Sequence, residues 1–196
     1  MQKHLILFIS IFICFSSVSQ INLDSLWRIW NDESQTDSIR LKAMLHITHD
    51  GYVFSQPDSA FYFAQLWYDF AESVGNNKWK ADALNTQGVS FAIRGNCKDA
   101  LVYYNKSLKL FEEMQDTIGM AYALGNIGII INYQGNYEEA LVYLNKSLKI
   151  NEELGVKNGI ASSLNNIGIV YKNFGLYSEA INSYKKSLKI SEEIGD

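Results

Sequence analysis

The chain has 196 residues, of which 47% are hydrophobic and 19% are charged, and its formal net charge is −4. This composition excludes an intrinsically disordered chain, because disorder requires low hydrophobicity combined with high net charge. A mildly acidic chain without a basic stripe also argues against nucleic acid as a partner, since neutralisation of phosphates supplies most of that affinity. With a single proline in the sequence, long stretches are free of helix breakers and favour helix.

The first residues differ from the rest of the chain. A basic start at Met1 is followed by an apolar run from Leu5 to Phe15 and by small polar residues that end at Ser19. These are the three parts of a secretory signal peptide. The apolar run is shorter than the roughly 20 residues that cross a bilayer. We therefore expect a signal peptide over residues 1–19, cleaved near Ser19, and a mature chain in the periplasm or cell envelope, not inserted in the membrane; a retained anchor is the alternative.

Beyond this leader the sequence repeats itself with a period of forty residues. The stretches KDALVYYNKSLKLFEEMQ, EEALVYLNKSLKINEELG and SEAINSYKKSLKISEEIG begin at Lys98, Glu138 and Ser178 and align without a gap. A fixed period of this size indicates a solenoid, in which each unit makes the same contacts with the next.

Each unit has the pattern of two helices. In the second helix the apolar residues recur at helical spacing along one stripe, with charged residues largely on the other face. The first helix, from about Gly119 to Gln134, is apolar over more of its surface and must be covered on more than one side. Gly135 and Asn136 then supply a turn, because glycine readily adopts the left-handed conformation that ends many helices.

The positions that carry similar residue types in each copy of the unit resemble those of the tetratricopeptide repeat, in a forty-residue form with lengthened helices. In the last copy these positions are Leu164, Ile167, Gly168, Tyr171, Gly175, Tyr177, Ala180, Tyr184 and Ser187. The resemblance implies an all-α fold, namely a right-handed α-solenoid of stacked antiparallel helix pairs. The glycine and alanine positions let paired helices approach closely.

The resemblance covers residues 37–196 as four repeats, at about 37–76, 77–116, 117–156 and 157–196. The first is divergent, although Ala60 is retained and Pro57 fits the first turn of its second helix. We expect residues 20–36 to cap this end with Leu26, Trp27 and Trp30. Terminal repeats are commonly atypical.

At the other end no capping helix follows the fourth repeat. We expect its apolar face to carry Ile181, Tyr184 and Leu188. Solenoids require a polar end for solubility. A truncated chain is the preferred explanation, and self-association through this face is the alternative.

Candidate chemical groups have simpler explanations. His46, His49 and Asp50 lie within one helical turn, but a zinc site needs three or four ligands and no further ligand converges in the sequence. The Glu pairs at 112/113, 152/153 and 192/193 each follow a lysine by four residues, as on a solvated ion-paired face. Cys97 has no disulfide partner in the mature chain and is expected to pack. We therefore predict no catalytic residue, no metal and no cofactor.

In the resembled family the first helix of each repeat lines a concave groove that holds a peptide or partner helix. Asparagines recur there and suit a peptide backbone, because an amide donates and accepts at once. A basic clamp for a carboxylate is not matched. The expected groove residues are Asn85, Tyr122, Asn126, Ile129, Tyr133, Asn165, Asn166, Ile169, Lys172 and Asn173.

These features predict a non-enzymatic, exported module that binds a protein or peptide segment in its groove. The leader, the divergent start and the forty-residue repeats are also similar to the N-terminal part of Bacteroidetes-type signalling proteins. That likeness implies the alternative function, the sensor part of a histidine kinase, a nucleotide cyclase or a transcriptional regulator whose output domain lies beyond residue 196.

Overall fold

The computed structural model describes residues 22–195, and the predicted signal peptide lies outside this range. Within it there is no strand, and no helix there is long and apolar enough to cross a membrane. The all-α class is thus confirmed. The helices are α2 (Leu23–Asn31), α3 (Asp37–His46), a π-helix η1 (Ile47–Tyr52), α4 (Pro57–Ser73), α5 (Asn77–Ile93), α6 (Cys97–Met114), α7 (Thr117–Tyr133), α8 (Tyr137–Leu154), α9 (Lys157–Asn173) and α10 (Tyr177–Ile194).

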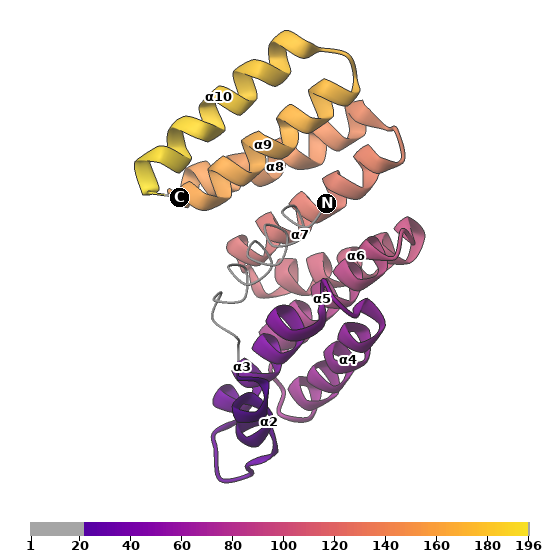
Figure 1. Cartoon of the computed structure of the whole chain (residues 1–196), viewed down its shortest axis with the longest axis vertical. Helices are drawn as coiled ribbons and strands as arrows, with labels where there is room; N and C mark the ends of the chain where they lie inside the picture. The colour runs from indigo at the N-terminus through magenta and orange to yellow at the C-terminus, as the bar shows by residue number, and fades with distance from the viewer. Residues whose placement is uncertain (1–21, 196) are drawn as a thin grey trace, which may run out of the picture.

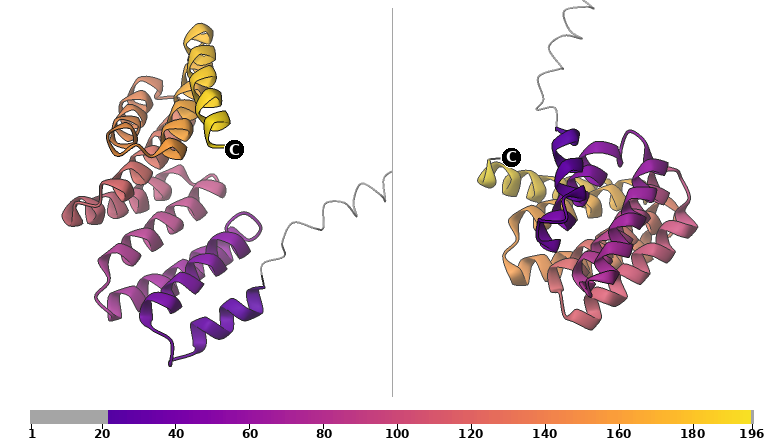
Figure 2. Two further views of the ribbon diagram at one scale, coloured as in Figure 1. Left: turned by 90° about the vertical axis from the view of Figure 1, so that its left-hand side faces the viewer. Right: turned by 90° about the horizontal axis from the view of Figure 1, so that it is seen from below.

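The helices form antiparallel pairs that stack in chain order (Figure 1). Helix α5 packs on α6, α7 on α8, and α9 on α10, and each second helix contacts the first helix of the next pair. Two views at right angles show the layers as a continuous, curved pile with no separate lobe (Figure 2). The predicted solenoid of stacked pairs is therefore the observed architecture.

The turn within each pair is set by a glycine. Gly95, Gly135 and Gly175 have φ of +75°, +83° and +83°, the left-handed region in which a side chain would be strained. After α7, the amide of Gly135 donates to the carbonyl of Asn132 at 2.9 Å, and the amide of Asn136 donates to that of Ile131 at 3.2 Å. These two hydrogen bonds satisfy carbonyl groups that have no partner within the helix at its C-terminal end.

A second glycine in each unit lets the paired helices touch. A Cβ built on Gly88, Gly128 or Gly168 would lie 2.6 to 2.7 Å from Tyr104, Leu144 or Tyr184 of the partner helix. Tyr184 therefore packs inside its own repeat. It is half-buried, whereas Ile181 and Leu188, predicted for the same end face, are exposed.

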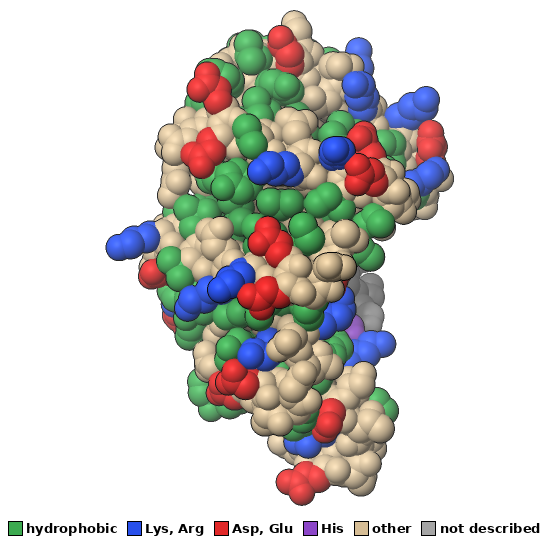
Figure 3. Space-filling model, turned by 180° about the vertical axis from the view of Figure 1, so that it is seen from behind, with side chains coloured by type: hydrophobic (Ala, Val, Ile, Leu, Met, Phe, Trp, Pro, Cys, Tyr) green, Lys and Arg blue, Asp and Glu red, His purple; other side chains and the backbone are tan. Residues whose placement is uncertain are grey.

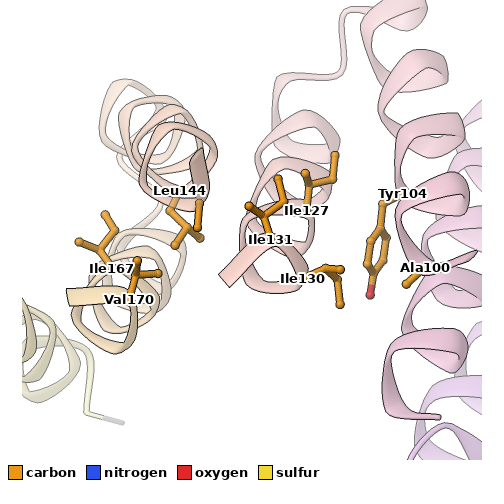
Figure 4. Packing of buried hydrophobic residues seen from close by; sticks show 9 residues of the cluster. Ala100, Tyr104, Ile127, Ile130, Ile131, Leu144, Ile167 and Val170 are labelled. Atoms are coloured by element: carbon orange, nitrogen blue, oxygen red, sulfur yellow. The ribbon is translucent and has the colours of Figure 1, made fainter. Parts of the chain in front are cut away.

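One cluster of buried side chains runs through the last three pairs (Figure 4). Three isoleucines of α7 lie between α6 on one side and α8 and α9 on the other, so α7 is covered on both sides as its sequence requires. The members are Ala100, Tyr104, Ile127, Ile130, Ile131, Ala140, Leu144, Ile167 and Val170.

A repeated hydrogen bond fixes the register of each pair. The hydroxyls of Ser107, Ser147 and Ser187 each donate at 2.8 Å to the carbonyls of Ala81, Ala121 and Ala161, respectively. Each serine is buried between the helices. Its small size and its donor together explain the recurring serine.

At the N-terminal end, α2 places Leu26, Trp27 and Trp30 against a second cluster that contains Met44 and Trp67. The helix predicted before Pro57 differs from expectation, because α3 changes into the π-helix η1. In η1 the amide of Val53 donates to the carbonyl of Thr48 at 2.9 Å, and the five-residue separation of this hydrogen bond is that of a π-helix. The Thr48 hydroxyl donates to the carbonyl of Met44 at 2.7 Å, an interaction that commonly accompanies distortion of a helix.

Candidate functional site

The three first helices α5, α7 and α9 form one surface, which we call the first-helix face. All ten predicted groove residues lie on these helices. Tyr122 and Tyr133 project strongly, with 64% and 75% of their surface exposed. Asn165, Lys172 and Asn173 are also exposed, and the remaining members are half-buried: Asn85, Asn126, Ile129, Asn166 and Ile169.

Four asparagines of this face bond to one another across neighbouring helices. The side-chain amide of Asn126 donates to Oδ1 of Asn85 at 3.0 Å, and that of Asn173 donates to Oδ1 of Asn132 at 3.2 Å. Each pair joins residues 41 positions apart, one between α5 and α7 and one between α7 and α9. An asparagine has two N–H donors and two acceptor sites, so each pair fixes its amides in place and leaves capacity for a ligand.

An apolar hollow lies between α5 and α7, beyond the Asn85–Asn126 pair. Its volume is about 510 Å³, and we call it the Ala92 hollow. At Ala92 only a methyl group stands where α7 has Asn132, so no amide pair forms there. The lining residues are Ala92, Ile93, Gly95, Cys97, Tyr104, Asn126, Ile129, Ile130 and Tyr133.

A second hollow, of about 250 Å³ and with several asparagines and serines in its lining, lies between α7 and α9. We call it the Gly125 hollow, because Gly125 occupies the position held by Asn85 one repeat earlier. It shares Asn126 and Ile129 with the Ala92 hollow, so the two hollows are neighbours along the face. Its lining is Ala121, Tyr122, Gly125, Asn126, Ile129, Ser147, Asn151, Asn158, Gly159, Ser162, Ser163 and Asn166.

The floor of the Gly125 hollow is a buried polar group. The Asn151 amide donates to the carbonyl of Ser147 at 3.0 Å and lies 3.4 Å from the hydroxyl of Ser163. One repeat earlier, Phe111 stands at the position of Asn151, and its ring fills the space beside Gly119. The shorter asparagine and the missing side chain at Gly125 together leave the space open.

Asn151, Asn158 and Ser163 were not among the predicted site residues. Two of them, Asn151 and Ser163, are buried, and a pattern of recurring exposed positions does not include buried residues. The available signal was a difference between copies, since the position of Asn151 holds phenylalanine in the preceding repeat.

Charged groups cluster at the start of α5. The Lys78 ammonium lies 2.6 Å from the carboxylate of Asp116, which caps α7. Burial raises the pKa of the nearby Asp82 carboxyl to about 6. His49 lies 2.8 Å from the Thr86 hydroxyl, and burial lowers the pKa of its imidazole. The His49–Thr86 contact joins the first two repeats, and the Lys78–Asp116 pair joins α5 to the start of α7.

The other candidate groups are structural. His46 lies 2.8 Å from the Asp50 carboxylate. Lys109–Glu113 and Lys149–Glu153 are exposed pairs at 3.9 and 3.7 Å, whereas Glu193 pairs with Lys157 of α9 at 3.0 Å. Residues 22–195 contain no group of three histidine, cysteine or acidic side chains arranged to hold a metal.

Cys97 is half-buried and packs at the edge of the main cluster, where it also lines the Ala92 hollow. The space-filling view from behind shows acidic and basic side chains interspersed, with no continuous surface of one sign on that face (Figure 3).

Residues 119–193 match the family model described as Tetratricopeptide repeat. No curated protein sequence matches the chain. Among solved structures it is similar to BtubC (BKLC) from P. vanneervenii, with a TM-score of 0.68 and 18% identity over 88% of this chain and 71% of that one. It is also similar to aspartyl phosphate phosphatase F from Bacillus subtilis, with a TM-score of 0.73 and 18% identity over 83% of this chain.

This chain spans only 43% of that phosphatase. A third similar structure is a putative kinesin light chain of Podosopora anserina with nearly identical TPR-like repeats, with a TM-score of 0.63 and 10% identity over 88% of this chain and 86% of that one. At such identities the likeness shows the fold alone. This fold generally serves as a non-catalytic scaffold for protein–protein interaction. Residues 119–193 are therefore tetratricopeptide repeats, and the described chain as a whole has the fold of a tetratricopeptide-repeat solenoid.

Proposed function

We propose that this protein is an exported, non-enzymatic interaction module that binds an extended segment of a partner protein along its first-helix face. The observation that carries the proposal is the alternation of asparagine pairs and hollows. Between α5 and α7 the Asn85–Asn126 pair is followed by the Ala92 hollow, and between α7 and α9 the Gly125 hollow is followed by the Asn132–Asn173 pair.

This alternation fits the chemistry of an extended peptide. Such a peptide presents main-chain N–H and C=O groups along its length, while successive side chains point to opposite sides. The fixed amides offer donors and acceptors to the main chain, as in other modes of peptide recognition. The hollows take the side chains that point toward the face.

The Ala92 hollow selects an apolar side chain. Ile93, Ile129 and Ile130 line it, and Tyr133 stands at its rim with most of its ring exposed. Burying an aliphatic or aromatic side chain there removes apolar surface of both partners from water, which stabilises the complex. Because no lysine or arginine lines either hollow, the ligand is neutral at these positions and its C-terminal carboxylate takes no part.

Export rests on the sequence of the leader. The basic start, the apolar run and the small residues before Gln20 are the parts of a cleavable signal. N-terminal sequencing of the protein expressed in a bacterial host and recovered from the periplasm tests this directly. A mature chain that begins at Gln20 is the expected result, and a protein that keeps Met1 in the cytoplasm contradicts export.

Binding is tested by selection from a random peptide library displayed on phage, with the full chain immobilised. Selected peptides are then synthesised and their dissociation constants measured by fluorescence anisotropy. We expect an apolar side chain in common among them. The double variant Tyr122→Ala/Tyr133→Ala removes two exposed rings of the first-helix face and should weaken binding at least tenfold.

A matched control removes two tyrosines of similar exposure from second helices. Tyr62 and Tyr177 are 59% and 66% exposed on α4 and α10, so the variant Tyr62→Ala/Tyr177→Ala should bind selected peptides as the unchanged protein does. Equal weakening by both double variants, or the absence of any selected peptide, contradicts binding on the first-helix face.

A further inference from the structure

The Gly125 hollow differs from the rest of the first-helix face in its unsatisfied polar groups. One repeat earlier, the amide of Asn126 donates to Oδ1 of Asn85. Asn166 is the counterpart of Asn126, but the counterpart of Asn85 is Gly125, which has no side chain. Among residues 22–195 the side chain of Asn166 therefore finds no hydrogen-bond partner, and it lines an open hollow instead.

The floor of the hollow supplies the complementary group. The amide nitrogen of Asn151 donates to the carbonyl of Ser147 and to the hydroxyl of Ser163. Its Oδ1 accepts no hydrogen bond from any residue of the described chain. Oδ1 itself lies against Gly159, where a Cβ would be only 2.1 Å away. Asn166, which can donate, and Asn151, whose Oδ1 can accept, line the same hollow.

We propose that this hollow binds a primary carboxamide side chain, that of glutamine or asparagine, on the peptide held by the first-helix face; the inference rests on the proposed function. A primary carboxamide carries one carbonyl acceptor and one NH₂ donor. Its carbonyl accepts from Asn166 as Oδ1 of Asn85 accepts from Asn126, and its NH₂ donates to Oδ1 of Asn151. The ligand thus replaces the side chain that Gly125 lacks.

Size and charge agree with this occupant. The volume of about 250 Å³ is several times the roughly 30 Å³ that one water molecule occupies in the liquid, so a side-chain end group fits. No cationic residue lines the hollow, and a carboxylate there would lose its hydration without gaining a counter-charge, which disfavours glutamate and aspartate. An aliphatic side chain would leave Asn151 and Asn166 unpaired.

The test uses the full chain labelled with ¹⁵N and the probe acetyl-Gly-Gly-Gln-Gly-Gly-N-methylamide, whose blocked end carries no primary carboxamide, with the side-chain NH₂ signal of Asn166 followed by NMR. The signal is assigned by its loss in Asn166→Ala. Matched probes carry glutamate or leucine in place of glutamine. We expect a saturable shift with the glutamine probe at a dissociation constant at least tenfold below those of the other two.

Two substitutions at one position then locate the binding. Gly125→Asn restores the pair seen one repeat earlier and fills the hollow, so it should abolish the shift of the Asn166 signal by the probe. Gly125→Ala adds only a Cβ, which would lie 3.5 Å from the Ser147 hydroxyl, and should keep it. Equal affinity for the three probes, or undiminished binding by Gly125→Asn, overturns the proposal.

These outcomes are separate from those of the proposed function. If library-selected peptides bind the first-helix face without a shared carboxamide and still bind Gly125→Asn, the proposed function stands and the carboxamide site is wrong. If no library peptide is selected but the glutamine probe meets the criteria above, the carboxamide site stands and the wider groove does not.

Discussion

Two glycines of α7 lie one turn apart and have opposite surroundings. Gly128 faces the partner helix, where a Cβ would lie 2.7 Å from the Leu144 side chain and 3.2 Å from the carbonyl oxygen of Ala140. Gly125 faces the hollow, where a Cβ would meet only the Ser147 hydroxyl at an ordinary contact distance of 3.5 Å. The same residue type therefore allows helix contact at one position and leaves the Gly125 hollow open at the other.

Substitution of each glycine by alanine should change stability with opposite sign. Gly125→Ala should raise the free energy of unfolding by about 0.5–1 kcal/mol, because glycine costs that much relative to alanine inside a helix. Gly128→Ala should lower it by about 1–2 kcal/mol, because crowding of a packed core outweighs the same helix gain. Urea denaturation followed by circular dichroism measures both. A change of the same sign in the two variants would contradict the assigned surroundings.

Asp82 should make stability depend on pH. Burial raises the pKa of its carboxyl from 3.8 to about 6, so the folded protein binds this proton more tightly than the unfolded chain does. The ionised carboxylate therefore destabilises the fold above pH 6, and the cost disappears as the pH falls from 6 toward 3.8. Asp82→Asn should raise the free energy of unfolding at pH 7.5 by up to about 3 kcal/mol.

That gain should shrink steadily when the same variant is compared with the unchanged protein at pH 6, 5 and 4. Glu112→Gln is the control, because Glu112 is an exposed carboxylate of α6 and its removal should change the free energy of unfolding only slightly. A gain at Asp82→Asn that stays constant over this pH range would instead indicate altered packing.

At the scale of helices, the repeat pattern predicted the features that all copies share and missed the contacts made by residues that differ between copies. The glycine turns and the all-α solenoid followed from the pattern alone. The contact between a second helix and the next first helix did not, because its partners vary together. Ala71 and Trp79 belong to one cluster, whereas at the same two positions of the next repeat Phe111 packs against Gly119, so the large residue stands on a different helix in the two repeats.

The candidate site was predictable in its helices and not in its cavities. The pattern placed the asparagines on α5, α7 and α9. Whether an asparagine forms a pair depends on whether the residue 41 positions earlier is also an asparagine, as Asn85 is for Asn126, or a glycine, as Gly125 is for Asn166. The π-helix η1 was likewise missed, since the bond from Val53 to Thr48 leaves no mark in hydrophobic periodicity. Such features depend on single differences among copies.

The helix N-termini give a prediction at this scale. Asp116 caps α7 by accepting from the amide of Gly119 at 3.0 Å, with φ and ψ of −79° and 88°. Val156 occupies the same place before α9 with nearly the same angles, −81° and 86°, and has no capping side chain. Val156→Asp should therefore make the same bond to the amide of Gly159.

Val156→Ala is the matched control, since it removes the same apolar side chain without adding an oxygen. The aspartate variant should exceed the alanine variant in free energy of unfolding by about 0.5–2 kcal/mol, the usual value of such a cap. Hydrogen exchange of the first turn of α9 locates the effect. Equal stability of the two variants would show that the cap does not form.

At the scale of the whole molecule, three clusters of buried side chains follow one another along the stack. The first joins α2 to α5 around Trp67, the next joins α5, α6 and α7 around Phe111, and the last joins α6 to α9 around the isoleucines of α7. Because each unit of a solenoid touches only its neighbours, the two ends are coupled through the helices between them. The alignment of both hollows depends on α7, which contributes residues to each.

Ile127 tests that coupling, because it is almost fully buried in the cluster around the isoleucines of α7. Ile127→Ala should lower the free energy of unfolding by about 2–5 kcal/mol, the range for a large-to-small change in a core. Ile118→Ala, at a side chain that is 47% exposed, should cost far less. In hydrogen exchange followed by mass spectrometry, Ile127→Ala should strip protection from α7 to α10 and largely spare α3 and α4, because the cluster around Trp67 has none of its residues on α7. Uniform loss from α3 to α10 would mean that the stack unfolds as one unit, and the first-helix face would then be a single rigid surface.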